Sequence, residues 1–535
     1  MQLYRTDKKE FSSEEILKFI TDYEQTEVPR LNKLWSYYQG KNTEILGRTL
    51  ATDSTTLKSN SENNFTESRV SKNKNTPDNL VPVPYGRKII TTFTGYAFRP
   101  KYITYKPIEL RQELEYELHK HSTDLTIGEI IQDDSKIPPE LKKKIEDDKK
   151  FYVEFSKNCR LNNEHIRTAR AGRNVGIFGL SYELLYLDSM MDGKLNMKAE
   201  VRYITVDPRE LILFYNYDSN PKKVSAIRYY GVTPNKYFVE VYYPDKIVKY
   251  VRERNEETEW SLKKEGTYPN YFKDIPVVAF YAGDEMLGLI EPVIPLIDAY
   301  DVLVSDSMNE FDRFAHAYLV LKRMSLVDPL KKKEPGAFSA ALANLKRYRV
   351  FESLEKDADV KFLTKDIPHQ YIQFMTNLVQ KQIHTQSHVP DFAGEKFTGA
   401  SGIAIQRLLF DFENVCSDIE ADFDVALYER MRLIAVIYKE LNRANGDWSV
   451  INISHKRNSP LNLEEYAKTA TLMKQAGFSS YLIADMMPDD VIPDVEEEVA
   501  RQKLEKEDLF TDVESTPDEE VDETEEEDEN EPTDE

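Results

Sequence analysis

The feature that constrains this fold most is a run of about forty residues, from 403 to about 443, that contains neither proline nor glycine. Nothing in the run would interrupt a helix. At a rise of about 1.5 Å per residue, the helix would be close to 60 Å long, which exceeds the width of a compact domain. We therefore expect an elongated architecture.

A second helix is predicted from residue 294 to about 316, and it carries two stripes. An apolar stripe and a polar stripe both recur at steps of three or four residues. The polar stripe contains no cation and consists of Asp298, Asp301, Ser305, Asn309 and Asp312. Surface helices usually mix their charges, because opposite charges one turn apart support the helix. The sequence leaves two interpretations of this stripe: a solvated face of a surface helix, or an acidic edge that has a function.

The segment after this helix is unusual in its order and its charge. A strand-like run begins at about residue 317, and residues 322–365 contain 11 Lys/Arg and 6 Asp/Glu, a net of +5 in an acidic protein. Another helix is predicted from about 368 to 388, where it stops before Pro390. Two helices that bracket a small mixed insert indicate a hairpin-shaped projection. The next run, DFAGEKFTGASG, is expected to be a flexible loop because of its three glycines.

The N-terminal part changes from helices to strands. Helices are predicted at 14–39 and, as one charged helix, at 137–174. A polar run near 53–79 lies between them and is predicted to be a loop. From 180 to 281, short runs rich in β-branched and aromatic residues alternate with turn signals, a pattern typical of strands. We therefore predict an α+β fold that is mainly helical, with a β-rich N-terminal part.

The net charge is concentrated in a tail. Residues 511–535 contain 15 Asp/Glu and no Lys/Arg, so −15 of the formal charge of −23 belongs to the tail and −8 to the rest. Such a tail cannot bury apolar surface and is expected to be disordered.

The cysteine content and the absence of long apolar runs bear on the compartment. Two cysteines without a partner at metal-ligand spacing favour a reducing compartment. No signal peptide and no apolar run of the ~18 residues that a membrane span needs is present, so no membrane association is expected.

No sequence motif supports catalysis. The chain has no Walker-type phosphate loop, no G-x-S-x-G and no H-E-x-x-H motif. His384 and His388 stand one turn apart beside Asp391 and could hold a metal, but no further spaced ligand accompanies them, and a polar helix face is the simpler interpretation. We predict no enzyme, no cofactor and no metal site. An acidic chain with one small basic region also argues against tight wrapping around DNA.

Five stretches of the sequence follow one another in an order that is more characteristic than any one of them. Together they span about residues 31 to 508. They are IITTFTGYAFRPKYITY; VGIFGLSYELLYLD followed by VRYITVDPRELILFY; IPLIDAYDVLVSDSMNEFDRFAHAYLVLK; SGIAIQRLLFDFENVC; and AGFSSYLIADMMPDDVIPDVEEEVARQKLEKE. In this order the chain resembles the portal proteins of tailed double-stranded DNA bacteriophages, in particular the long-tailed siphovirus type that infects Gram-positive hosts. None of the stretches is a sharp signature alone.

The resemblance implies a ring of identical subunits, typically a dodecamer, at one capsid vertex around a central channel for DNA. It also implies a portal fold with wing, stem, clip and crown. Carried onto this chain, the parts are the N-terminal wing 1–289, the first stem helix 290–316, the clip 317–365, the second stem helix 366–388, the tunnel loop 389–402, the long wing helix with its return strand 403–457, the crown 458–510 and the acidic tail 511–535.

The resemblance also offers a purpose for the acids of the first stem helix. Carboxylates that face a channel would repel phosphates within a Debye length of about 8 Å. Cations in their place would add contacts that make the duplex stick. We therefore expect channel-lining residues among Asp298, Asp301, Asp306, Glu310 and Asp312. One helical wheel does not fix which of them point inward and which pair with a neighbouring subunit.

Two further sets of residues follow from the resemblance. The tunnel-loop set, with Lys396 expected to contact phosphate, is Phe392, Lys396, Phe397 and Thr398; a plain flexible hinge is the alternative. The clip set is basic and consists of Lys331, Lys332, Lys333, Lys346, Arg347 and Arg349. These cations are expected to dock an acidic partner, or alternatively to balance acids on an adjacent subunit.

Together these expectations describe a non-enzymatic portal, the connector through which DNA is packaged and ejected. The implied partners are other copies in a homo-oligomeric ring, double-stranded DNA, the terminase large subunit, a head-completion or adaptor protein, and the major capsid and scaffolding proteins. The implied location is the virion portal vertex, with the host cytoplasm during assembly. The alternative is another ring-forming virion protein, such as a head-tail adaptor or a baseplate component.

Overall fold

The computed structural model of the 535-residue chain describes residues 4–47, 79–101, 103–107, 139–188, 198–233, 236–254, 260–315, 318–322, 359–363, 369–392, 402–457 and 463–487, with a few isolated positions besides. The chain divides into two compact units, Met1–Asn458 and Ser459–Glu535. The first unit contains both long helices and sheets, which confirms the α+β class. Among the described residues, no helix combines the length and the apolar character that crossing a bilayer requires.

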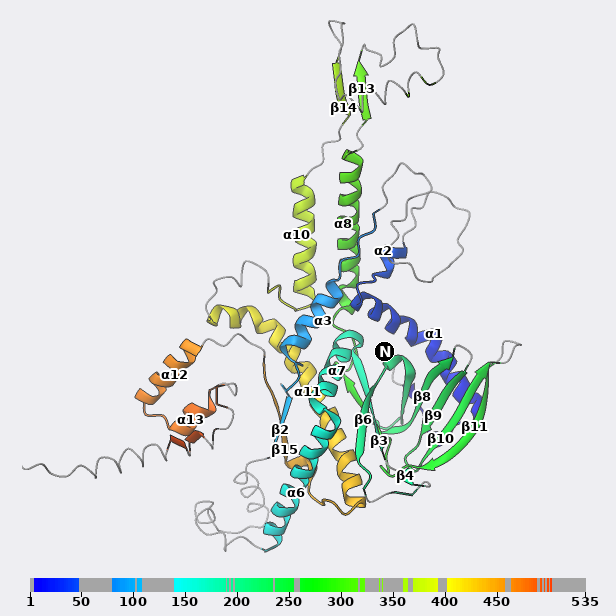
Figure 1. The fold of residues 1–535 in the computed structure, drawn as a ribbon, viewed down its shortest axis with the longest axis vertical. Coiled ribbons are helices and arrows are strands. Elements are labelled where there is room, and N and C mark those ends of the chain that lie inside the picture. The colour runs from blue at the N-terminus through cyan, green and yellow to red at the C-terminus, as the bar shows by residue number, and fades with distance from the viewer. Residues whose placement is uncertain are drawn as a thin grey trace, which may run out of the picture. The chain divides into compact units, whose positions relative to one another are not determined.

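A six-stranded sheet and the first helix form one side of the first unit (Figure 1). The order is β1 (Tyr4–Arg5), β7 (Leu211–Tyr215), β8 (Lys223–Thr233), β9 (Lys236–Tyr242), β10 (Lys246–Arg254) and β11 (Trp260–Pro269), antiparallel except for the parallel β1–β7 pair. Helix α1 (Ser13–Tyr38) confirms the predicted helix 14–39, and a capping box between Ser12 and Glu15 starts it. Its buried residues, among them Tyr23, belong to the same core as Phe214 of β7.

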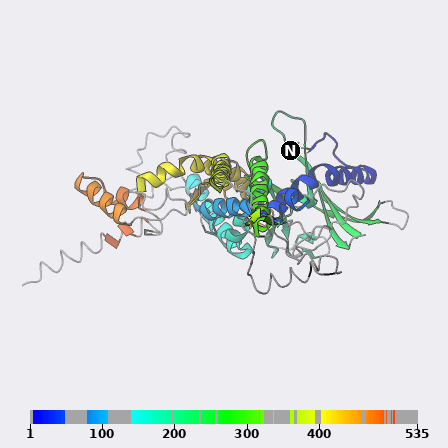
Figure 2. The same ribbon diagram turned by 90° about the horizontal axis from the view of Figure 1, so that it is seen from above.

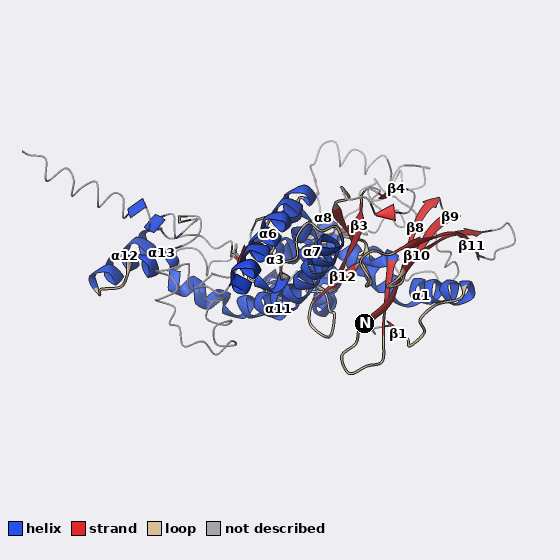
Figure 3. Cartoon of the chain, turned by 90° about the horizontal axis from the view of Figure 1, so that it is seen from below, coloured by secondary structure: helices blue, strands red, loops and turns tan. Residues whose placement is uncertain are grey.

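A smaller sheet lies among the helices, in the order β12 (Val277–Tyr281), β3 (Leu180–Leu187) and β6 (Val201–Val206). It contacts α7 (Glu164–Phe178) and α11 (Gly402–Glu440), and α7 also packs on α3 (Tyr85–Tyr96). Figure 3 shows these helices gathered beside the strands. The close approach of α7 to the residues just after α3 depends on Gly172, because a Cβ there would lie 2.3 Å from the Phe98 ring.

The predicted single helix 137–174 is wrong in one respect. The chain forms two helices, α6 (Pro139–Asn162) and α7, which are separated by Asn163 with φ +50° in the left-handed region. Asparagine tolerates this conformation better than most residues. A periodic charge pattern continues across a single residue of this kind, which is why the break is not visible in the sequence pattern.

The long helix is present as predicted. Helix α11 contains 39 residues, so its length is about 58 Å. It is followed by the short helix η5 (Trp448–Val450) and by β15 (Ile451–His455), which pairs with β2 (Ile103–Pro107). The remaining small elements of the first unit are α2 (Thr43–Gly47), β4 (Met190–Met191), β5 (Lys194–Leu195), η2 (Pro208–Glu210) and η3 (Glu291–Val293).

Two antiparallel helices project from this body, as the pattern predicted. They are α8 (Ile294–Ala315) and α10 (His369–Gln386), which we call the α8/α10 pair. In Figure 1 they run side by side, and β13 (Tyr318–Lys322) and β14 (Asp359–Leu363) pair beyond their far ends. The strand-like run near 317 is thus confirmed as a strand.

The second unit contains α12 (Leu463–Gln475) and α13 (Ser480–Asp485), which contact each other. The Ser479 side chain caps α13 by accepting a hydrogen bond from the Leu482 N–H. The prediction of short helices in this region is confirmed for the described residues.

Candidate functional site

The polar stripe of α8 is covered by an extended segment of the same chain, residues 79–83, which we call the docked segment. Three of its backbone N–H groups donate to three side chains of the stripe: Val83 to Asp301 (2.8 Å), Val81 to Ser305 (3.0 Å) and Asn79 to Asn309 (2.6 Å). The middle of the stripe, from Asp301 to Asn309, therefore binds backbone N–H groups of its own chain.

The spacing of the stripe matches the spacing of an extended chain. Every second N–H of an extended segment points the same way, at intervals of about 6.6 Å. Four residues of an α-helix advance about 6.0 Å, so acceptors at Asp301, Ser305 and Asn309 meet every second N–H group of the segment. Short polar side chains suit this contact, because the backbones lie close together.

Both ends of the docked segment are fixed by side chains. At the upper end, the Asn79 amide donates to Asp312 (2.5 Å), and Asn309 donates back to the Asn79 carbonyl (3.3 Å). At the lower end, the Asn42 amide donates to Asp301 (2.5 Å) and to the Val83 carbonyl (3.1 Å). Below it, the Tyr37 hydroxyl donates to Asp298.

Asp301 is the centre of this network. It is 0% exposed and accepts one hydrogen bond on each carboxylate oxygen. Burial raises the pKa of Asp301 to about 6, although the hydrogen bonds from Asn42 and Val83 act in the opposite direction. Burial thus makes the charged form of Asp301 less favourable, and the two hydrogen bonds offset only part of this effect.

This geometry corrects the channel-lining prediction for one residue. Asp301 faces its own chain and is fully buried, so it cannot line a channel. Asp298 and Asp312 are half-buried and each accepts a hydrogen bond from within the subunit. Asp306 is exposed and Glu310 is half-buried, and both lie on a different side of α8 from the stripe.

The other helix of the pair is fixed at its base by aromatic and ionic contacts. The Tyr85 ring of α3 lies 5.0 Å from the Tyr300 ring and 6.0 Å from the His384 ring. His384 Nδ1 lies 2.9 Å from the Val389 carbonyl, and Lys88 pairs with Asp391 at 2.8 Å. Figure 2 looks along the α8/α10 pair and shows the two helices next to each other.

These contacts explain His384 and Asp391 without a metal. The His384 Nδ1 carries a proton when it bonds the carbonyl, and Nε2 lies 3.9 Å from Asp391. Asp391 also lies 3.5 Å from the Gln380 amide. Among the residues that the structure describes, no three His, Cys, Asp or Glu side chains form a metal-binding group.

Most other predicted site residues are not described. Phe392 is 43% exposed at the end of a described range, and the remaining tunnel-loop residues Lys396, Phe397 and Thr398 lie outside the described residues. The basic clip residues Lys331, Lys332, Lys333, Lys346, Arg347 and Arg349 also lie outside them, as does the acidic tail.

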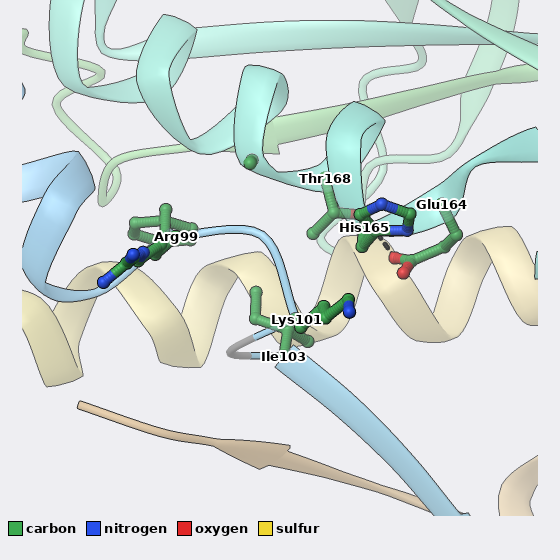
Figure 4. A pocket seen from close by; sticks show the side chains of 8 residues that line it. Arg99, Lys101, Ile103, Glu164, His165 and Thr168 are labelled. Carbon is green, nitrogen blue, oxygen red and sulfur yellow. Dashed lines mark hydrogen bonds between the residues drawn. The ribbon is translucent and has the colours of Figure 1, made fainter. Parts of the chain in front are cut away.

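A shallow pocket elsewhere in the first unit is lined by exposed cations and by buried polar side chains. Figure 4 shows its lining, which includes Arg99, Lys101, Glu164, His165 and Thr168. The Glu164 carboxylate turns inward, where it accepts from Tyr105 (2.6 Å), Thr168 and the buried Arg430 (3.2 Å). We assign no ligand to this pocket.

The sequence contained a signal for the docked segment that the prediction missed. The run NLVPVP places Pro82 and Pro84 next to the donors Val81 and Val83. Proline lacks an N–H and favours an extended residue before it, so alternate prolines leave only alternate donors. The donor Asn42, in contrast, carries no local signal, because it lies 259 residues before Asp301.

Comparison with known proteins gives a family match along most of the chain. A family model described as "Phage portal protein, SPP1 Gp6-like" matches residues 17–131 and 135–531. The portal protein of Bacillus phage SPP1 is 23% identical to this chain over 225 residues, which are 39% of this chain and 43% of that relative. The aligned stretch therefore spans less than half of the relative's length. The family match covers most of this chain, which belongs to the SPP1 Gp6-like family of phage portal proteins.

Proposed function

We propose that copies of this chain form a ring at one vertex of a phage capsid and that double-stranded DNA enters and leaves through the ring. The observation that carries the proposal is the family match along nearly the whole chain. The family is structural rather than catalytic, so the energy for DNA movement would come from a terminase motor docked on the ring.

In this proposal, the α8/α10 pair forms the stem and residues 317–365 form the clip. The clip would dock the terminase large subunit during packaging and a head-completion or adaptor protein afterwards. Residues 389–402 would form the tunnel loop, 458–510 the crown, and the rest of the first unit the wing. The dodecamer and the contacts with capsid and scaffolding proteins are parts of the same proposal.

The acids of α8 that remain candidates for the channel wall are Asp306 and Glu310, followed by the half-buried Asp298 and Asp312. Asp306 and Glu310 are one turn apart, so they would form one negative column per subunit. Repeated around a ring, such columns would keep phosphates from binding the wall.

A charge reversal tests this assignment. We expect the variant Asp306→Lys/Glu310→Lys to form rings but to package DNA at least about tenfold more slowly, because cations would bind the duplex. The control is Asp284→Lys/Glu285→Lys, which makes the same charge change at two exposed acids outside the α8/α10 pair. Equal packaging by both variants would contradict the channel assignment.

The ring itself is tested on the unmodified full chain by mass photometry and by electron microscopy. A closed multimer with a central hole is the expected result. A chain that stays monomeric or dimeric at all concentrations and salt conditions would overturn the proposed function.

A further inference from the structure

The α8/α10 pair exposes large apolar side chains on both helices. On α10, Tyr371 and Phe374 are each 61% exposed and Leu378 is 39% exposed; on α8, Met308 is 49% and Phe311 is 66% exposed. Single exposed apolar residues are normal on a protein surface. Five of them on one projecting pair of helices mark a surface that is covered by something else.

The three residues of α10 lie away from the side that packs on the body. Ile383 is fully buried, and Val379 packs against the same core. Phe374 precedes Ile383 by nine residues, which places it half a turn round the helix from that buried side. Tyr371 and Leu378 are one turn from Phe374 and share its face. We call these three residues the α10 patch.

The two residues of α8 lie on a side that its own chain does not cover. Phe311 follows Ser305 by six residues, so it points about 120° away from the stripe that holds the docked segment. Met308 is three residues before Phe311 and lies next to it on the helix surface. We call these two residues the α8 patch.

The two patches lie at the same level of the pair. The Tyr85 ring lies 5.0 Å from the Tyr300 ring and 6.0 Å from the His384 ring, so these two residues lie near each other at the base of the pair. Phe311 is eleven residues beyond Tyr300, and Phe374 is ten residues before His384, so in antiparallel helices both lie about 15 Å further out.

From this arrangement we infer that the α8 patch of one subunit packs against the α10 patch of the next subunit, with Phe311 opposite Phe374. The inference rests on the proposed ring. Two different patches at one height suit a head-to-tail contact between copies that are rotated about an axis along the helices. A self-complementary patch would instead give two-fold dimers. Neither patch contains a cation, so the five residues lack the charge that would hold DNA phosphates.

Disulfide trapping in the full chain tests the contact. The variants are Phe311→Cys, Phe374→Cys and the double variant Phe311→Cys/Phe374→Cys. Both positions are highly exposed, so the substitutions should not disturb folding, and melting curves check this. The single variants control for the natural cysteines, of which Cys416 is buried and Cys159 is half-buried.

The head-to-tail contact predicts a specific pattern after mild oxidation. The double variant should give a ladder from dimers up to the closed ring on a denaturing gel. Each single variant should stay uncrosslinked, whereas a mixture of the two single variants assembled together should give dimers only. Dimers from a single variant alone would overturn the inference, because they indicate a two-fold contact.

A second measurement separates this inference from the proposed function. Rings that form in mass photometry without any crosslink in the double variant would overturn the inference and leave the ring standing. The failure of every variant and of the unmodified chain to form rings would overturn both.

An independent test places a charge in the α10 patch. We expect Phe374→Glu to raise the protein concentration needed for ring assembly at least tenfold. The control Tyr217→Glu, at a residue 62% exposed in the turn after β7, should leave this concentration within twofold. Equal assembly of the two Glu variants would also contradict the inference.

Discussion

At the residue scale, Asp301 connects three parts of the chain. Its carboxylate accepts hydrogen bonds from the Val83 N–H and from the Asn42 side-chain amide, and the residue has no exposed surface. Replacement by alanine would leave the Val83 N–H without its acceptor and would leave the Asn42 amide with only the Val83 carbonyl, which costs about 2 kcal/mol or more. We expect Asp301→Ala to speed amide hydrogen exchange at Val83 about thirtyfold, since each 1.4 kcal/mol is a factor of ten. The control Asp306→Asn, at an exposed acid of the same helix, should leave this exchange within about twofold.

The same residue predicts a pH dependence. The pKa of Asp301 is about 6 in the folded chain because of burial, against 3.8 for an unperturbed aspartate. Between about pH 4 and pH 6 the folded state therefore binds more protons than the unfolded state, and the contribution of this group to stability falls as the pH rises. In contrast, Asp301→Asn cannot titrate. The melting temperature of the natural chain should thus decline relative to that of Asp301→Asn across this window, and parallel curves would show that the carboxyl group titrates normally.

At the scale of elements, the docked segment shows how a helix and an extended chain fit together. Only alternate N–H groups, at Asn79, Val81 and Val83, donate to α8. Leu80, between two of them, donates no backbone hydrogen bond to the stripe. This alternation offers a matched pair of substitutions in one short segment.

We expect Val81→Pro to weaken the docking of residues 79–83 by about 1–3 kcal/mol, because it removes one donor and leaves the buried Ser305 hydroxyl without it. Leu80→Pro introduces the same ring and the same preference for extended backbone but removes no bond of the set. Limited proteolysis at residues 79–84 should therefore be faster in Val81→Pro than in Leu80→Pro. Equal rates in the two variants would mean that the N–H groups do not hold the segment.

At the scale of the whole molecule, one buried arginine joins distant parts of the first unit. Arg430 of α11 lies 3.2 Å from Glu164 of α7, 3.3 Å from Glu183 of β3 and 2.9 Å from the Tyr105 hydroxyl of β2. Burial raises the pKa of Glu183, and the nearby Arg430 opposes that shift. The arginine is 1% exposed, so its partners depend on it for compensation of their charge.

Removal of this arginine should destabilise the first unit as a whole. Arg430→Met would leave two carboxylates buried without a counter-charge, at a cost of about 3–5 kcal/mol. Arg432→Met is the matched control two residues away, because the Arg432 side chain is 37% exposed and pairs at the surface with Asp274. Thermal unfolding of the two variants provides the comparison, and equal melting temperatures would contradict a central role of the Arg430 network.

By itself, the sequence determined which elements form. Helices α1, α8, α10 and α11 and the strands between 180 and 281 follow from periodicity and from the positions of proline and glycine, which act within a few residues. The one clear failure among the helices, the break at Asn163, concerns a single residue whose left-handed backbone has no effect on the pattern around it.

Only the tertiary structure decided what the elements face. The polar stripe of α8 was visible in the sequence, but its partners lie 218 to 261 residues away. No local rule distinguishes a backbone N–H from water as the group that an aspartate binds. Burial of Asp301 and exposure of Asp306 therefore depend on where the chain returns, which hydrophobic packing of α1, α3 and α8 fixes. The periodicity of polar and apolar residues in the sequence indicates which side chains share one side of a helix. Only the packed structure determines which of those sides remains exposed for another molecule.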